Sequence, residues 1–241
     1  GLMAGINAAL KVRNCSTFVL GRDEAYIGVM IDDLVTKGVD EPYRMFTSRA
    51  EHRLHLREDN ADLRLTEKGY DICAVGKQRY HRVVDKKNSI EEAFQRWRSI
   101  RLKPTKGTQQ RLKDLGLEGI KNPVTLEDLL KKPEITIGKL RGIEGNLETI
   151  EEDIAYQVEL NVKYRGYTER QQDMIERTRK LEDKKIPAGT RYDEVSGLSR
   201  EVIEKLTRVR PLSLGQASRV PGVTPASITA LLVHFKKTGT L

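Results

Sequence analysis

The sequence has few of the residues on which disulfide-rich, metal-binding and membrane-spanning proteins depend. Among 241 residues there are two cysteines and four histidines, and aromatic residues make up only 5%. Cys15 and Cys73 are too few for a disulfide framework or a thiolate zinc site. No apolar run approaches the length of a membrane-spanning helix, and the first ten residues lack a secretory signature. We therefore expect a cytoplasmic protein.

Motifs of self-sufficient catalysis are also absent. There is no Gly-x-Gly-x-x-Gly fingerprint and no P-loop. Neither cysteine has a histidine or other base beside it. The four histidines, at positions 52, 55, 81 and 234, do not have metal-ligand spacing. We predict no catalytic residue and no metal site in this chain.

Charge is abundant and arranged in blocks. The net charge is +8, and residues 77–113 hold twelve Lys and Arg against three acidic residues. Residues 114–160 reverse this balance, with eleven acidic and five basic residues, before basic character returns over 163–210. This pattern is typical of polyanion-facing surfaces separated by an acidic scaffold. Solvated helix faces are the alternative.

Apolar spacing predicts a mainly α fold. The ranges with helical periodicity are 1–11, 23–36, 60–68, 78–101, 125–131, 148–181, 200–206, 214–219 and 225–237. Ser199, Ser213 and Thr224 are expected to cap the last three helices, and Thr125 with Asp128 resembles a capping box. Gly69 is expected to interrupt a helix, residues 103–107 to form a loop and residues 186–189 a linker. Residues 53–57 alternate polar and apolar side chains, which predicts a short half-buried strand.

An arginine-rich stretch over residues 42–64 is the strongest functional signal. Its five arginines are Arg44, Arg49, Arg53, Arg57 and Arg64. Guanidinium groups grip phosphates in pairs, so the stretch indicates an anion-handling surface. Salt bridges to the acidic residues of the same stretch are the alternative, namely to Glu51, Glu58, Asp59 and Asp62.

Two further segments have features suited to RNA. Tyr164 and Tyr167 stand beside Arg165 and Arg170, which combines stacking with charge. Ordinary helix packing also explains these tyrosines. The tail segment 214–226 resembles a helix-hairpin-helix module, although a threonine and a proline stand where such a hairpin needs its second glycine. A small protein-docking bundle explains the tail equally well.

The chain resembles a known family. The segments that carry the resemblance are residues 1–9 (GLMAGINAA), 22–29 (RDEAYIGV), 42–64, 195–199 (VSGLS) and 214–232. They are similar to the GidA (MnmG) flavoproteins of tRNA modification. The resemblance covers the C-terminal portion of such a protein, without its FAD-binding fingerprint. It implies three parts: a remnant of the FAD-binding domain with some α/β character over 1–60, a helical domain over 61–186 and a C-terminal helical subdomain over 187–241.

The resemblance also implies an activity and partners. With the MnmE GTPase, the intact enzymes add a carboxymethylaminomethyl group at C5 of the tRNA wobble uridine, using FAD, NADH and methylene-tetrahydrofolate. It implies an intact homodimer, and a helical part that binds tRNA and MnmE. Gly1 is expected to face FAD, held mainly by the N-terminal portion that is absent here, and Arg57 and Arg64 to contact tRNA or the active site. The alternative is a protein-interaction module that docks an acidic partner without touching RNA.

Overall fold

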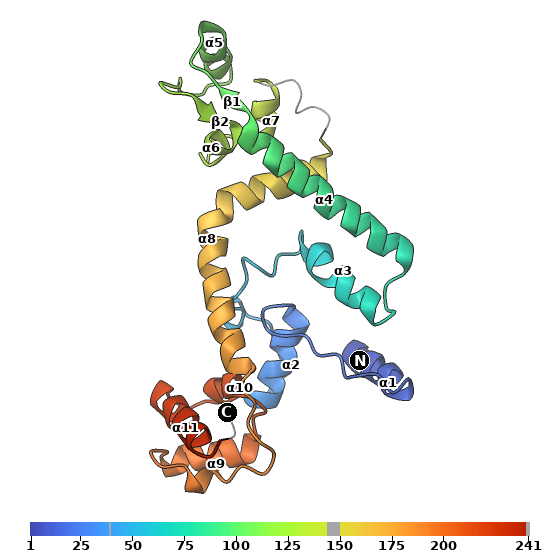
Figure 1. Ribbon diagram of the computed structural model, residues 1–241, viewed down its shortest axis with the longest axis vertical. Helices are drawn as coiled ribbons and strands as arrows, with labels where there is room; N and C mark the ends of the chain where they lie inside the picture. The colour runs from blue at the N-terminus through green and yellow to red at the C-terminus, as the bar shows by residue number, and fades with distance from the viewer. Residues whose placement is uncertain (39, 144–149, 240–241) are drawn as a thin grey trace. The chain divides into compact units, whose positions relative to one another are not determined.

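The computed structural model describes residues 1–38, 40–143 and 150–239 (Figure 1). These residues are mainly α-helical, as the sequence predicts. The helices are α1 (Leu2–Val12), α2 (Tyr26–Thr36), α3 (Ala61–Asp71), α4 (Lys77–Ser99), α5 (Lys106–Asp114), α6 (Leu126–Leu130), α7 (Ile137–Arg141), α8 (Glu152–Glu182), α9 (Arg200–Val209), α10 (Leu214–Arg219) and α11 (Pro225–Lys237). Two short strands, β1 (Arg101–Leu102) and β2 (Val124–Thr125), pair antiparallel with Arg101 opposite Thr125. Among the described residues, no helix is both long and apolar enough to cross a lipid bilayer.

The chain forms two compact units that are interleaved in sequence. Unit 1 combines Gly1–Phe18 with Arg57–Glu169, and unit 2 combines Val19–Leu56 with Arg170–Leu241. Helix α8 contributes its first part to unit 1 and its last part to unit 2. Long-range packing of this kind leaves no mark in local periodicity. The three-part division inferred from family resemblance stays a prediction.

Unit 1 is built on a core around Trp97 of α4. Its indole is fully buried, together with leucines from the following short helices: Leu112, Leu126, Leu130 and Leu140. Val158 of α8 completes this layer. Helix α3 lies along α4 (Figure 1), and the rings of Tyr70 and Tyr80 stack with their centroids 4.3 Å apart. The β1–β2 pair joins the end of α4 to the start of α6.

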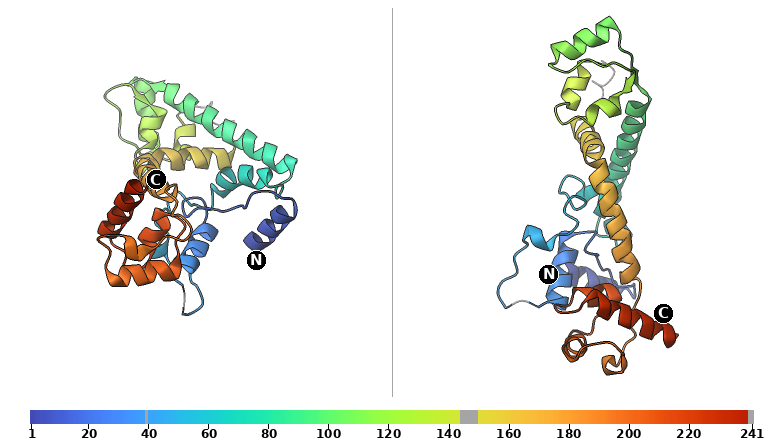
Figure 2. Two further views of the ribbon diagram at one scale, coloured as in Figure 1. Left: turned by 60° about the horizontal axis from the view of Figure 1, so that its bottom comes forward. Right: turned by 90° about the vertical axis from the view of Figure 1, so that its left-hand side faces the viewer.

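Unit 2 contains a bundle of the three tail helices, which lie together in every view (Figures 1 and 2). Its core consists of Leu206 of α9, Leu214 of α10, and Leu231 with Phe235 of α11. Ile186 of the preceding linker is buried in the same cluster. Helix α10 also contacts α2. The tail is thus a closed bundle attached to the N-terminal segment of the same unit.

Side-chain caps begin several of the helices, and those predicted at Thr125, Ser199, Ser213 and Thr224 are confirmed, whereas Asn60 does not cap α3. Ser199, Ser213 and Thr224 each accept a hydrogen bond from the backbone N–H three residues later. Thr125 forms a complete capping box with Asp128. These motifs are local, so the sequence alone reveals them.

Replacement of Ser213 by alanine tests one such cap. The Ser213 hydroxyl is buried, accepts from Gln216 N at 3.0 Å and donates to Glu182. Loss of both contacts is expected to lower the free energy of unfolding by about 1–2 kcal/mol. Urea denaturation measures this, with Ser199→Ala as the control, because the hydroxyl of the exposed Ser199 makes its cap bond to Val202 N. A Ser213→Ala loss no larger than that of Ser199→Ala would contradict a second role for Ser213.

Three local predictions are wrong. Residues 53–57 form turns and not a strand, because the carbonyl of His52 accepts hydrogen bonds from the N–H groups of both His55 and Leu56. Helix α5 begins at Lys106 inside the expected loop, where Thr105 caps it. Gly69 lies within α3 and does not interrupt it. The predicted start of α8 at position 148 lies outside the described residues, and the described helix begins at Glu152.

Candidate nucleic-acid interface

The arginine-rich stretch is divided between the two units. Its first three arginines belong to unit 2: Arg44, Arg49 and Arg53. Its last two belong to unit 1: Arg57 and Arg64. In unit 2, residues 42–56 form a loop with one 3-10 turn, η1 (Thr47–Arg49). We call residues 42–56 the arginine loop.

Arg22 binds the arginine loop to α2. The residue is 8% exposed, and it donates two parallel hydrogen bonds to Glu51 at 2.7 and 2.8 Å. Its Nη2 also donates to the carbonyl oxygen of Arg49 at 2.9 Å. Its Nη1 donates to Asp32 at 3.0 Å and to Asp33 at 2.8 Å. The planar fork of a guanidinium suits such paired contacts. Burial opposes the charge of Arg22, but Glu51 and Asp33 outweigh it and raise the pKa of Arg22.

Asp33 is an acceptor that several loop side chains share. Its side chain is fully buried and accepts from Lys37 Nζ at 2.9 Å, from the Tyr43 hydroxyl at 2.9 Å and from Arg49 Nη1 at 3.3 Å. Burial alone would raise its pKa, but the hydrogen bonds from Lys37, Arg22 and Tyr43 outweigh burial and lower the pKa to about 2. Asp33 therefore stays ionised and fixes Tyr43 and Arg49 in the first half of the arginine loop.

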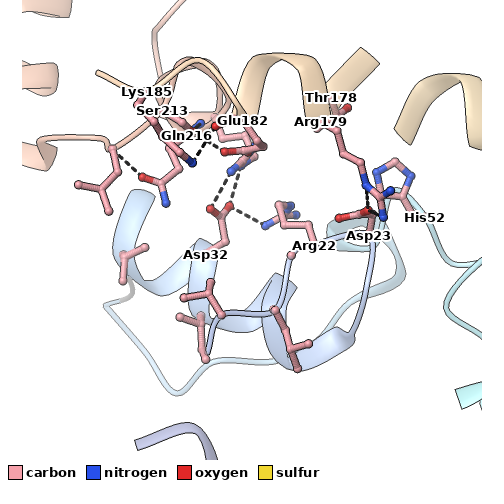
Figure 3. A pocket seen from close by; sticks show the side chains of 18 residues that line it. Arg22, Asp23, Asp32, His52, Thr178, Arg179, Glu182, Lys185, Ser213 and Gln216 are labelled. Atoms are coloured by element: carbon pink, nitrogen blue, oxygen red, sulfur yellow. Dashed lines mark hydrogen bonds and ion pairs between the residues drawn. The ribbon is translucent and has the colours of Figure 1, made fainter. Parts of the chain in front are cut away.

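Arg219 of α10 extends this buried network to the tail. It donates two hydrogen bonds to Asp32, at 2.6 and 2.7 Å, and pairs with Glu182 at 2.5 Å. Glu182 in turn accepts from the Ser213 hydroxyl. In Figure 3 a dashed line joins Asp32 to Arg22, and Glu182 lies above Asp32. The network thus joins α2, the end of α8 and α10.

Arg44 and Arg53 remain available on the surface of the arginine loop. Both residues are exposed, and neither side chain makes a hydrogen bond or ion pair with the residues that the structure describes. Thr47 and Ser48 beside them are exposed as well. Arg49 is engaged by Asp33, which lies outside the stretch. Among the described residues, the salt bridges predicted within the stretch therefore account for none of the three arginines of this loop.

The two arginines of unit 1 have partners close in sequence. Arg57 Nε donates to Asp59 at 3.0 Å. Arg64 donates from Nε to the Asn60 side chain at 2.8 Å and from Nη2 to the Arg57 carbonyl at 3.1 Å. Asp59 also accepts from Gln157 of α8 at 2.8 Å, which ties this segment to the helix. Asn60 stands at the start of α3, as predicted, but its side chain binds Arg64 and does not cap the helix.

Tyr164, Arg165 and Tyr167 lie on the unit 1 part of α8. The two tyrosine side chains are 39% and 57% exposed, with ring centroids 6.5 Å apart, so both rings offer faces for stacking. Arg165 is engaged with the buried Glu127, and its guanidinium lies 4.7 Å from the centroid of the Phe94 ring. Arg170 is exposed and belongs to unit 2.

Gly1 begins α1 without a side-chain cap. A Cβ added at Gly1 would have no atom within 4 Å. Helix N-termini can bind phosphate groups, and the role expected of Gly1 is to face FAD. That role stays a prediction. In the described part of the chain, no group of three or more metal-ligating side chains is found.

Arg22, Asp33 and Arg219 were not among the predicted site residues. A signal for them exists in the sequence of α2, where Asp32 and Asp33 interrupt an otherwise apolar helix. Adjacent carboxylates that face a core require a cation. The sequence does not reveal which cation this is, because Arg219, one of the partners, lies far from Asp32 along the chain.

His52 of the arginine loop is 2% exposed, and its pKa is lowered mainly by burial. Glu51 and Asp23 oppose this shift, and Arg22 reinforces it. Just below pH 6.5, the ordinary pKa of histidine, the imidazole of His52 therefore binds a proton in the unfolded chain but not in the folded chain. The unfolded state is then favoured as pH falls, by up to about 1.4 kcal/mol per pH unit.

Urea denaturation between about pH 7 and pH 5.5 tests this effect. The free energy of unfolding of the wild-type chain should fall more steeply than that of His52→Gln. Asp33 and Glu51 cause no loss of stability in this pH range, because their ordinary pKa values of 3.8 and 4.5 lie below it and folding lowers both pKa values further. Equal slopes for the two proteins would contradict the assignment to His52.

Comparison with known proteins identifies the family. Residues 77–172 match the model of the "tRNA modifying enzyme MnmG/GidA C-terminal helical domain", and residues 174–240 match that of the "tRNA modifying enzyme MnmG/GidA C-terminal helical bundle". The chain belongs to the MnmG/GidA family. It is 53% identical over 236 residues to the "tRNA uridine 5-carboxymethylaminomethyl modification enzyme MnmG" of Geotalea uraniireducens, and 50% identical over 237 residues to that of Listeria welshimeri.

The match covers nearly all of this chain but only part of its relatives. Both alignments include 98% of the chain and 38% of the relative. A crystal structure of Aquifex aeolicus GidA superimposes with a TM-score of 0.81 at 40% identity, over 96% of this chain and 36% of that one. The MnmG/GidA family resemblance seen in the sequence is thus confirmed, as is the mainly α fold.

Proposed function

We propose that this chain is the C-terminal tRNA-binding and partner-docking part of a flavoprotein of tRNA modification. With the MnmE GTPase, the whole enzyme would add a carboxymethylaminomethyl group at C5 of the wobble uridine. The names of the MnmG relatives support the reaction. The observation that carries the tRNA contact is the pair of unengaged arginines, Arg44 and Arg53, on a loop held by buried ion pairs.

A loop fixed in this way suits phosphate binding. Arg22 holds the arginine loop through Glu51 and the carbonyl of Arg49, and Asp33 holds it through Tyr43. Less conformational entropy is then lost when a phosphate binds Arg44 and Arg53. Arg57, Arg64, Arg165 and Arg170 remain candidate tRNA or active-site contacts, and Tyr164 a candidate stacking platform.

The cofactors of the proposed enzyme follow from the family. We propose FAD, held mainly by protein outside these 241 residues and approached by Gly1, with NADH as reductant and methylene-tetrahydrofolate as carbon donor. We also propose that the intact protein is a cytoplasmic homodimer. The chain alone is not expected to catalyse turnover, because the flavin is proposed to be held mainly by other parts of the enzyme.

Filter binding of tRNA to the 241-residue chain tests the proposal. Affinity should be highest at low salt and fall steeply between about 50 and 200 mM, because each neutralised phosphate releases a counterion. A DNA duplex of the same charge serves as the polyanion control and should bind less tightly. No retention of tRNA at the lowest salt would refute the RNA role.

Partner docking needs a separate experiment, because an acidic protein could bind the same basic blocks. Immobilised chain should capture MnmE before and after RNase treatment. If MnmE is captured and tRNA binds no better than duplex DNA, the protein-interaction alternative replaces the RNA proposal. If MnmE is not captured, the docking part of the proposal fails.

A further inference from the structure

Unit 2 contains a cavity that the tRNA proposal does not use. It has a volume of about 370 Å³, and it lies between the segment that leads into α2 and the elements around the end of α8 and the start of α10 (Figure 3). Cavities of this size accept small organic molecules. Every residue that lines it belongs to unit 2.

The imidazole of His52 lines this cavity and has no hydrogen-bond partner among the described residues. Neither of its ring nitrogens is bonded to a described residue, and both are removed from solvent. Buried polar atoms are nearly always paired, and an unpaired one costs about 1–3 kcal/mol. Asp23 and Arg179 lie beside the ring (Figure 3) but bind each other, with 2.7 Å from Arg179 Nε to Asp23. An imidazole in this state can still donate one hydrogen bond and accept another.

Of the charged side chains that line the cavity, Lys185 is not paired with a carboxylate of a described residue. The lining contains four cationic residues and three carboxylates: Arg22, Arg179, Lys185 and Arg219 against Asp23, Asp32 and Glu182. Each carboxylate is paired with an arginine. Lys185 is exposed, and among the described residues its Nζ donates only to the carbonyl oxygen of Glu182, at 2.9 Å. In Figure 3, Lys185 and His52 stand at opposite sides of the labelled set.

Apolar side chains supply the rest of the wall. Val19, Ile31, Val35 and Leu212 all line the cavity, and all four are exposed in the chain. Such a wall favours a flat apolar body, while the polar groups favour hydrogen bonding and one negative charge.

We propose that this cavity binds a small organic anion with a flat apolar body, which carries one carboxylate or phosphate group. Its anionic group pairs with Lys185, its body packs on Val35 and Leu212, and an edge of the body meets His52. The proposal does not rest on tRNA binding by Arg44 and Arg53.

Nuclear magnetic resonance of the histidine side chains tests this proposal in the intact 241-residue chain. The four imidazoles of uniformly ¹⁵N-labelled protein give four sets of resonances, and His52→Asn assigns the set of interest. Benzoate and phenyl phosphate are the anionic probes, and benzamide is the neutral probe of the same shape. We expect a saturable shift of the His52 resonances with about millimolar affinity, and no saturable shift of the other three.

Charge selectivity separates this site from general apolar adsorption. An anionic probe should bind about two- to fivefold more tightly than benzamide, as expected of one exposed ion pair. Lys185→Met should abolish this preference, whereas Lys180→Met, an exposed lysine outside the cavity lining, should preserve it. The tighter of the two anions identifies carboxylate or phosphate as the natural group. No saturable His52 shift, or a preference that survives in Lys185→Met, would overturn the proposal whatever the outcome with tRNA.

Discussion

Replacement of Arg22 by methionine is expected to destabilise unit 2 by about 3–5 kcal/mol. Methionine fills much of the volume of arginine but removes the cation that Glu51 and Asp33 share. Asp33 has no exposed side-chain surface, so its charge cannot be hydrated in place. The loss is larger than that of a surface ion pair because the buried Asp32 and Asp33 each lose a cationic partner.

Urea unfolding followed by circular dichroism measures this change. Arg22→Lys is the graded variant: it keeps a charge but cannot reproduce the parallel hydrogen bonds to Glu51, so its loss should be intermediate. Arg200→Met is the matched control, because the Arg200 side chain is 94% exposed and its contact with Glu204 is 3.6 Å long. It should cost less than about 0.5 kcal/mol. An Arg22→Met loss within about 1 kcal/mol of this control would contradict the network as described.

The double variant Arg44→Gln, Arg53→Gln is expected to weaken tRNA binding strongly without loss of stability. Both side chains are exposed and make no ion pair with described residues, so glutamine removes no internal contact. Each phosphate contact contributes about 0.7–0.9 to the slope of log affinity against log salt. The slope should therefore become shallower by about 1.4–1.8 in the variant, and affinity at low salt should fall by at least about tenfold.

A matched pair shows whether position or total charge is responsible. Arg200→Gln, Arg208→Gln removes two exposed charges from α9 of the same unit. In this control the affinity for tRNA, and the slope of log affinity against log salt, should change clearly less than in the arginine-loop variant. Equal losses in the two variants would mean that net charge, and not the arginine loop, accounts for binding.

How far the sequence predicts this structure depends on the range of the interaction. The caps at Ser199, Ser213 and Thr224 are read correctly because each hydroxyl binds an N–H three residues away. The alternation of residues 53–57 is misleading because it does not reveal that the His52 carbonyl closes a turn. Local periodicity predicts regular elements well and short irregular loops poorly.

The candidate site is predictable in composition but not in arrangement. The spacing of the arginines indicates an anion-binding surface, but it does not reveal which arginines are paired with carboxylates in the folded protein. Arg49 points to Asp33, whereas Arg44 and Arg53 do not bind a described residue. The decisive partner, Arg22, precedes the stretch by some twenty residues. Only the folded arrangement separates arginines that build the loop from those that are available to a ligand.

The central claim is that Arg44 and Arg53 contact tRNA while Arg22 holds the loop that carries them. Modification by phenylglyoxal, which reacts with accessible arginines, tests it directly when each site is quantified by mass spectrometry. In the free chain, Arg44 and Arg53 should be modified and the buried Arg22 spared. Saturating tRNA should protect Arg44 and Arg53 and leave the exposed Arg200 reactive. Full modification of Arg44 and Arg53 in the tRNA-saturated chain would contradict the account.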